Sequence, residues 1–151
     1  VQAAQVAGLL YVWRNVVQVA ASWPVGWLAD RVGHLPVLVA GYGLGVATAV
    51  LTALAFWSDL DSVALLAGIF CIAGLYVAVQ EALESTVTAE MVPAETMTMS
   101  MGALGTVNGT AKFLSSATVG VVWTAVSPVL AFALAATFML AGTLAILRVR
   151  D

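Results

Sequence analysis

Four ionisable side chains lie within long apolar stretches of this sequence: Arg14, Glu81, Glu84 and Lys112. A charged group at the centre of a membrane-spanning helix costs roughly 2.5–3.5 kcal/mol on insertion scales, so such residues usually face one another or a wet cavity. Glu81 and Glu84 are three residues apart, and two carboxylates in a poorly solvated place cannot both ionise cheaply. One of them is therefore expected to bind and release a proton, which is the property that proton-coupled transport requires.

Neutral polar residues accompany these charges at helical spacing. Gln18 follows Arg14 by four residues and Lys112 follows Asn108 by four, so each pair lies on one face of its helix. Two bases and two acids make a neutral set, which lowers the cost of burying them if they pair. Three alternatives stay open: Glu84 is solvated near the surface, the two bases extend toward water, and the two amides only pack helices together. The predicted substrate or transport pathway comprises Arg14, Gln18, Glu81, Glu84, Asn108 and Lys112.

The sequence does not indicate catalysis. Cys71 is the only cysteine and His34 the only histidine, so neither a disulfide within the chain nor a metal site nor a nucleophile–base pair is expected. We predict no catalytic residue, no metal and no cofactor, and hence a protein that is not an enzyme. The formal charge of −3 is too small to indicate a nucleic-acid partner.

The composition is that of an integral membrane protein. Hydrophobic residues make up 62% of the 151 positions and charged residues only 9%, whereas about a quarter of the residues in ordinary globular proteins are charged. A helix needs about 20 mostly apolar residues to cross the hydrocarbon of a membrane. The stretch at 129–147 shows none of the alternation that a membrane-spanning β-strand requires. The expected fold class is therefore all-α.

Five membrane spans fit the sequence. All four prolines fall where an apolar stretch ends or begins, with Pro24 at the end of the first, as expected of a residue without an N–H donor. The second and fifth spans lack ionisable residues and are predicted to be a lipid-facing scaffold. The third contains no breaker after its predicted end and is extended to about 90. No initiator Met is present, so we expect a piece of a longer protein. The predicted spans are Ala3–Trp23, Leu35–Trp57, Ser62–Glu84, Met99–Ala125 and Pro128–Leu147.

The basic residues predict the orientation, and small residues predict close packing. Arg31 and His34 lie between the first two spans, and Arg148 and Arg150 follow the fifth. With five spans both places are on one side, which the positive-inside rule assigns to the cytoplasm. Close helix approach is expected at two glycine pairs with GxxxG spacing: Gly41/Gly45 and Gly105/Gly109.

Two stretches resemble the major facilitator superfamily. The run PVGWLADRVGHLPVL at 24–38 is similar to the GxLADRxGRK signature that follows the second and eighth helices of these twelve-helix transporters, although His34 and Leu35 stand where basic residues are usual. A polar tight turn is the alternative. In the signature, glycines would allow close helix approach, and the charged pair can hydrogen-bond helix ends across the cytoplasmic face. The matching residues include Gly26, Asp30, Arg31 and Gly33.

The second stretch covers the later helices. AGLYVAVQE at 73–81, followed by TAEMVPAE at 88–95, is similar to the family's tenth helix and the loop after it, with Glu81 on an acidic position. Met97 and Thr98 replace the usual Arg-Gly. Residues 102–123 resemble the eleventh helix. The resemblance thus implies helices eight to twelve, the C-terminal part of a fold whose substrate site lies near the midplane between two halves.

This resemblance implies a function. We expect a secondary active transporter that moves a small solute by alternating access, most plausibly proton-coupled efflux of a drug-like compound or metabolite. Proton-coupled uptake of an organic solute and a non-transporting scaffold or receptor with the same fold are the alternatives. Arg14 and Lys112 would suit an anionic group on the solute. The expected location is the inner or plasma membrane, in contact with lipid, and the expected partner is the N-terminal half of the same protein.

Overall fold

The fold is all-helical, as the composition predicted. The structure, a computed structural model, describes residues 2–60 and 62–149. Apart from the first, each helix begins and ends within a few residues of its predicted span, if the third span is taken with its extension to about 90. The third helix ends at Met91. A 3-10 turn at Ala94–Thr96 precedes the fourth. The helices are α1 Gln2–Val32, α2 His34–Trp57, α3 Val63–Met91, α4 Met97–Ala125 and α5 Pro128–Val149.

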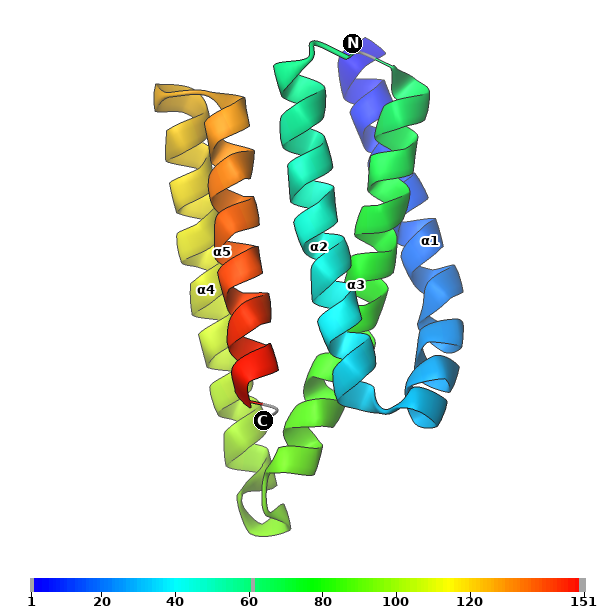
Figure 1. The fold of residues 1–151 in the computed structure, drawn as a ribbon, viewed down its shortest axis with the longest axis vertical. Coiled ribbons are helices and arrows are strands. Elements are labelled where there is room, and N and C mark those ends of the chain that lie inside the picture. The colour runs from blue at the N-terminus through cyan, green and yellow to red at the C-terminus, as the bar shows by residue number, and fades with distance from the viewer. Residues whose placement is uncertain (1, 61, 150–151) are drawn as a thin grey trace.

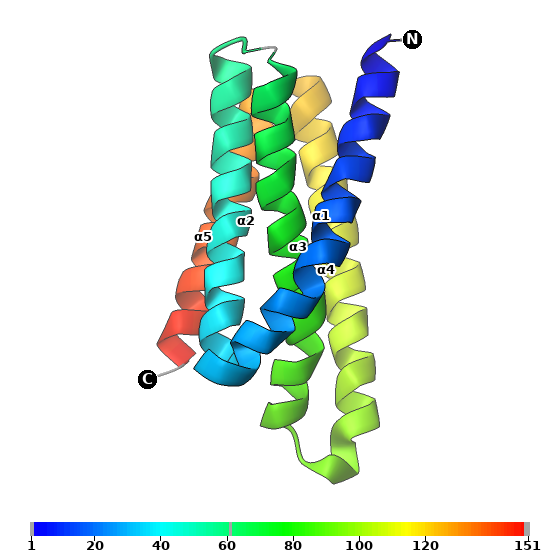
Figure 2. The ribbon, with the colours of Figure 1, turned by 90° about the vertical axis from the view of Figure 1, so that its right-hand side faces the viewer.

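The helices run alternately up and down, joined by short turns (Figure 1). The α1–α2 turn, the α3–α4 turn and the last turn of α5 lie at one end of the bundle, at the bottom of Figures 1 and 2. Arg31 and Arg148 therefore share this end, as predicted; Arg150 lies outside the described residues. We call it the Arg31 end.

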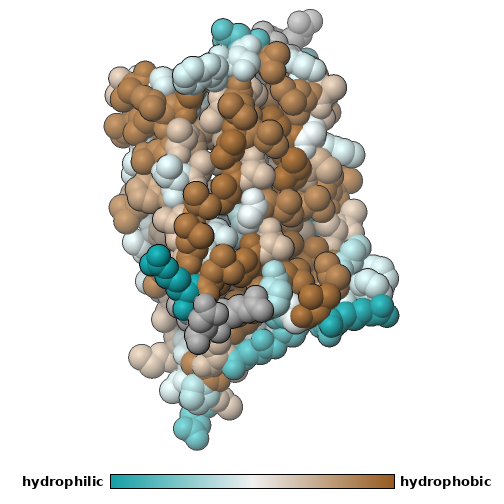
Figure 3. Space-filling view, viewed as in Figure 1, coloured by the Kyte–Doolittle hydropathy of each residue, from teal (hydrophilic) through white to brown (hydrophobic). Residues whose placement is uncertain are grey.

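Hydropathy supports membrane crossing to different degrees along the chain. Within the described residues α2, α3 and α5 are long and apolar enough to span a membrane. α1 and α4, with 31 and 29 residues, are about 45 Å long, which exceeds the roughly 30 Å of hydrocarbon, but polar side chains lower their hydropathy. Figure 3 shows a brown apolar band across α2 and α5, with hydrophilic residues gathered mainly at the lower end.

The prediction that Pro24 ends the first span is wrong. Pro24 lies inside α1, which continues to Val32. Proline removes one hydrogen-bond donor and tends to bend a helix, but neighbouring helices make this tolerable in membrane proteins. Figure 2 shows α1 changing direction in its second half as it crosses toward α2. Asp30 and Arg31 consequently lie on the last turn of α1 instead of in a loop.

Gly33 separates α1 from α2. Its φ of 105° lies in a region that side chains other than glycine rarely adopt. Its N–H donates to the carbonyl of Ala29 at 2.8 Å, which closes the last turn of α1. The chain then reverses, and α2 begins at His34, one residue before its apolar segment starts. The glycine of the signature therefore allows the turn and not the close helix approach expected for it.

α2, predicted to be part of a lipid-facing scaffold, packs closely on its neighbours and keeps an exposed apolar face. It lies between α3 and α5 (Figure 1) and also packs against α1, while Val50, Leu51 and Leu54 are exposed. Gly41 and Gly45 are buried against Val79 and Met139, as the GxxxG spacing predicted, whereas nothing approaches Gly105 or Gly109 of α4. The small residues of α2 let two other helices approach its backbone on this side.

The apolar core lies where α1, α2 and α3 meet near the Arg31 end. Its buried residues are Ala29, Val37, Leu38, Val79, Leu83 and Val87. At the opposite end Phe56, Trp123 and Phe132 hold α2, α4 and α5 together, with ring centroids 5.3–5.7 Å apart. By contrast, α4 contains no buried residue. Glu81 and Glu84 lie at the level of the first cluster, because Val79, Leu83 and Val87 flank them along α3.

Candidate functional site

α3 carries both predicted acids, and each acid receives a hydrogen bond from a different helix. Gln18 Nε2 of α1 donates to Glu81 Oε2 at 2.6 Å, and Asn108 Nδ2 of α4 donates to Glu84 Oε1 at 2.9 Å. The acids are three residues apart on α3, so their directions differ by about 60° around the helix axis, and each is reached by an amide of a different neighbouring helix. The structure thus brings together four of the six predicted pathway residues, Gln18, Glu81, Glu84 and Asn108, which we call the polar set.

Glu84 is the more enclosed of the two acids. It is part-buried, and its second carboxylate oxygen accepts from Gln80 Nε2 at 3.4 Å, whereas Glu81 is exposed. Solvation of Glu84 near the surface, one of the open alternatives, is therefore wrong for this part of the chain. The physical reason is that α3 continues to Met91, about two helical turns beyond Glu84, and that α2 and α4 flank this carboxylate.

Arg14 and Lys112 do not pair with the two acids. Within the described residues, the ion pairs involve only His34. Arg14 Nη1 donates to Asn15 Oδ1 at 3.4 Å and its guanidinium lies 5.6 Å from the Tyr11 ring, while Lys112 is exposed. Of the two arrangements that the sequence left open, pairing of bases with acids is therefore not the one in this structure. Amides take the place of the bases because Gln18 and Asn108 lie one turn nearer to the acids.

α2 contributes a tyrosine to this site that the sequence did not indicate. The part-buried side chain of Tyr42 interacts with Glu84, and the Tyr76 ring of α3 lies 6.3 Å from that of Tyr42. α2 has no charged residue between its ends, so the pattern of charges did not point to Tyr42 as a contact of Glu84. Tyr42 directly follows Gly41, the glycine that packs most closely on α3, and this neighbouring position could have indicated the contact.

This arrangement suits reversible protonation. An ionised carboxylate only accepts hydrogen bonds, and both acids face N–H donors of amides. When a carboxylate gains a proton it becomes a donor, and an amide can rotate to present its carbonyl oxygen instead. Each acid–amide pair therefore has a hydrogen-bonded arrangement in both protonation states. Because the pairs join α3 to α1 and to α4, a change of state acts at two helix contacts.

The signature residues lie at the Arg31 end, and their contacts differ from those predicted. Asp30 faces His34 and not a helix end, and the Arg31 guanidinium stacks 3.9 Å from the Trp27 ring. Nothing lies within 4 Å of a Cβ added at Gly26, so close helix approach is not its role here. These side chains are too far along α1 from Gln18 to belong to the polar set.

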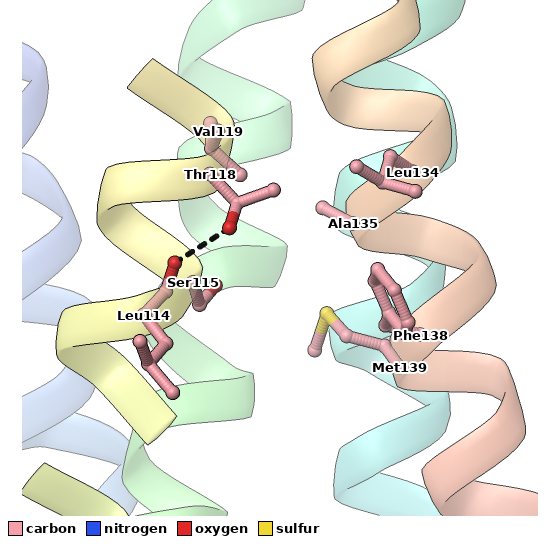
Figure 4. Close-up of a pocket in the computed structure, with 8 residues that line it drawn as sticks. All are labelled: Leu114, Ser115, Thr118, Val119, Leu134, Ala135, Phe138 and Met139. Atoms are coloured by element: carbon pink, nitrogen blue, oxygen red, sulfur yellow. Dashed lines mark hydrogen bonds between the residues drawn. The ribbon is translucent and has the colours of Figure 1, made fainter. Parts of the chain in front are cut away.

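A cavity of about 340 Å³ lies between α4 and α5 (Figure 4). Most of its lining side chains are apolar, and the hydroxyl of Thr118 donates to the carbonyl of Leu114 at 2.8 Å. It contains none of the predicted pathway residues. The lining residues are Leu114, Ser115, Thr118, Val119, Leu134, Ala135, Phe138 and Met139. The polar set instead lies on the α1–α3–α4 side of the bundle.

Comparison with known proteins assigns nearly the whole chain to one family profile. The profile described as Major Facilitator Superfamily matches residues 2–151. No curated protein and no solved structure matches the chain significantly.

Proposed function

The chain belongs to the major facilitator superfamily, a family of membrane transporters that move small solutes, and from this premise we propose that its polar set lines part of a proton-coupled solute pathway. The observation that carries the proposal is the pair of acids on α3, each held by an amide of another helix at 2.6 and 2.9 Å. Acids within membrane segments mark proton relays in many transporters.

The two acids have different tasks in this proposal. Glu81 is exposed on the side of α1 and is the acid that meets the solute or water. Glu84 joins α3 to α4 through Asn108 and to α2 through Tyr42, and it also accepts a hydrogen bond from Gln80 of α3 itself. Its protonation therefore changes the contacts of three helices. A proton bound at Glu84 thereby alters helix packing, which is the step that alternating access needs.

The two bases are the candidates for binding solute. Arg14 lies one turn from Gln18, Lys112 one turn from Asn108, and neither makes an ion pair with the acids within the described residues. A base in a membrane segment that lacks a carboxylate partner favours an anionic ligand. We therefore propose a solute that carries an anionic group.

The position in the full protein follows from the signature and the basic residues. We propose that the chain is the C-terminal part of the transporter, helices eight to twelve, with the N-terminal half supplying the opposite wall of the pathway. The Arg31 end, with Arg148, then faces the cytoplasm by the positive-inside rule, and the protein lies in the inner or plasma membrane. Efflux is our first choice of direction. Uptake is the alternative, and no particular contact favours it.

The test uses the full-length protein in proteoliposomes with an imposed pH gradient and a panel of anionic and cationic fluorescent solutes. Glu84→Gln and Glu81→Gln should each reduce gradient-driven transport by at least about tenfold, which corresponds to about 1.4 kcal/mol, while exchange without a gradient persists. Glu95→Gln, in the exposed turn before α4, is the matched control and should leave both unchanged.

Three results would count against the proposal. Full dependence on the pH gradient in both acid variants would refute proton coupling through α3. Unchanged transport of anions after replacement of both Arg14 and Lys112 by Gln would refute the anionic solute. Absence of flux for every solute, with a correctly folded protein, would favour the scaffold or receptor alternative, because that fold needs no pathway.

A further inference from the structure

His34 joins three helices at the Arg31 end. It is the first residue of α2, its Nδ1 lies 2.6 Å from Glu90 Oε1 of α3, and its Nε2 lies 3.4 Å from Asp30 Oδ1 of α1. The imidazole thus bridges carboxylates from the two helices that carry Gln18 and Glu81. The family signature has a basic residue at this place, which remains charged at any physiological pH, whereas histidine titrates near neutrality.

The packing around His34 makes its position rigid. Its side chain is 23% exposed, against 78% for Asp30 and 55% for Glu90, so the carboxylates lie outside and the ring lies between the helices. Gly33, with its positive φ, fixes the start of α2 just before it. On the inner side the buried cluster of Ala29, Leu38 and Val87 holds the same three helices together.

The charge of the ring decides how many of these contacts survive. A protonated imidazole has two N–H donors, one for each carboxylate; a neutral imidazole has one donor and one lone pair. Losing the proton therefore leaves one carboxylate facing a lone pair, which is repulsive. With its hydrogen at Nδ1 the neutral ring would keep Glu90 and release Asp30, and the opposite tautomer would release Glu90.

The charged groups around the ring act in one direction. Hydrogen bonds that the ring donates to Glu90 and, to a smaller extent, to Asp30 raise the pKa of His34 above its usual 6.5. Arg31 of α1 points toward Trp27, and Arg148 of α5 is not among the groups that act on the ring. The contribution of the protonated ring to stability is therefore complete below about pH 6.5 and is lost as the pH rises through the raised pKa of the folded protein.

We propose that His34 is a pH-sensitive clamp that, when protonated, holds the Arg31 ends of α1 and α3 together through Asp30 and Glu90, and that loss of its proton loosens this end. The clamp is distinct from the proposed proton site at Glu81 and Glu84, because it needs neither a solute nor a pH gradient. It makes the arrangement of one end of the bundle depend on the pH at that face, while the apolar cluster beneath keeps the helices associated.

The first test is the titration of His34 in the full-length protein, in detergent micelles, by NMR with ¹⁵N-labelled histidine. The spectrum of His34→Gln identifies the resonance, because His34 is the only histidine in these 151 residues. The midpoint should lie above 6.5 and should fall toward 6.5 in Glu90→Gln and, to a smaller extent, in Asp30→Asn. A midpoint that neither variant moves would overturn the bridge.

The second test asks whether the protonation state moves the helices. Spin labels at Val32→Cys and Met91→Cys, both exposed at the ends of α1 and α3, report the distance between these ends. The background is a protein whose own cysteines, including Cys71, are replaced by serine. The distance distribution should be narrow at about pH 5.5 and broader at about pH 8.5, on either side of the titration range of histidine. Glu90→Gln should be broad at both values. A wild-type distribution that is the same at both values would refute the clamp, whatever the outcome for proton-coupled transport.

Discussion

Gly41 of α2 offers the sharpest test of how this bundle is packed. The glycine is buried against Val79 of α3, and a Cβ added at position 41 would overlap both Cβ and Cγ1 of that valine. A valine side chain has no flexible end that can move aside, because it branches at Cβ and has one strongly preferred rotamer in a helix. Gly41→Ala must therefore push α2 and α3 apart.

The magnitude follows from two opposing effects. Overpacking a well-packed core costs typically about 1–3 kcal/mol, whereas alanine in place of glycine within a helix gains about 0.8–1 kcal/mol. Gly41→Ala should thus lower the free energy of unfolding by up to about 2 kcal/mol. Gly43 is the matched control, two residues along the same helix, because nothing lies within 4 Å of a Cβ there. Gly43→Ala should stabilise, so the two variants should differ by about 1–3 kcal/mol.

The assay is reversible unfolding of the full-length protein in mixed micelles, followed by circular dichroism as the fraction of denaturing detergent increases. Val79→Ala completes a double-mutant cycle with Gly41→Ala. Val79→Ala removes both Cγ atoms of the valine but keeps its Cβ. Gly41→Ala should therefore cost less in that background, with an interaction free energy of about 0.5–3 kcal/mol. Equal effects of Gly41→Ala and Gly43→Ala, or an interaction free energy near zero, would refute the packing of α2 on α3 described above.

Three further predictions use the same unfolding assay. Trp13→Phe removes a hydrogen bond of 3.1 Å from the indole to a backbone carbonyl of α3, so it should cost about 0.5–1.5 kcal/mol; no loss would mean that the bond is not formed in the membrane protein. Phe132→Leu removes the aromatic contacts with α2 and α4 and should cost more than Phe138→Leu at an exposed site, by about 0.5–1.5 kcal/mol for each aromatic pair. Gly74→Ala would place a Cβ 2.7 Å from a backbone oxygen of α1, whereas Gly68 faces open space; Gly74→Ala should therefore destabilise and Gly68→Ala should not, and the reverse order would contradict the α1–α3 contact.

The polar set illustrates which contacts a sequence can reveal. Helical spacing placed Arg14 with Gln18 and Asn108 with Lys112, and these pairs do lie on shared helix faces. Spacing carries no information about the vertical offset between two helices. In the structure that offset aligns the amides with the acids of α3, so the bases extend beyond them. A shift of about one turn, roughly 5.4 Å, separates this arrangement from one in which the bases pair with the acids.

The end of α1 illustrates a different gap. Proline commonly ends helices in water because its missing donor and its ring oppose the preceding turn, and Pro24 was assigned that role. Within a membrane bundle, the lost bond is compensated locally and the helix continues through the proline. As a result Asp30 lies on α1 and within reach of His34, and the signature becomes part of a contact among three helices.

The sequence by itself determined the membrane class, the helical fold, five helices with most of their ends, and the shared end of Arg31 and Arg148. These properties follow from local chemistry: apolar length, helical periodicity and breakers such as Gly33 act within one segment. Only the tertiary structure decided that α2 packs between α3 and α5, that amides hold Glu81 and Glu84, and that His34 bridges α1 and α3. Those contacts depend on the offset and rotation of neighbouring helices, which the packing of small residues sets jointly and no single segment encodes.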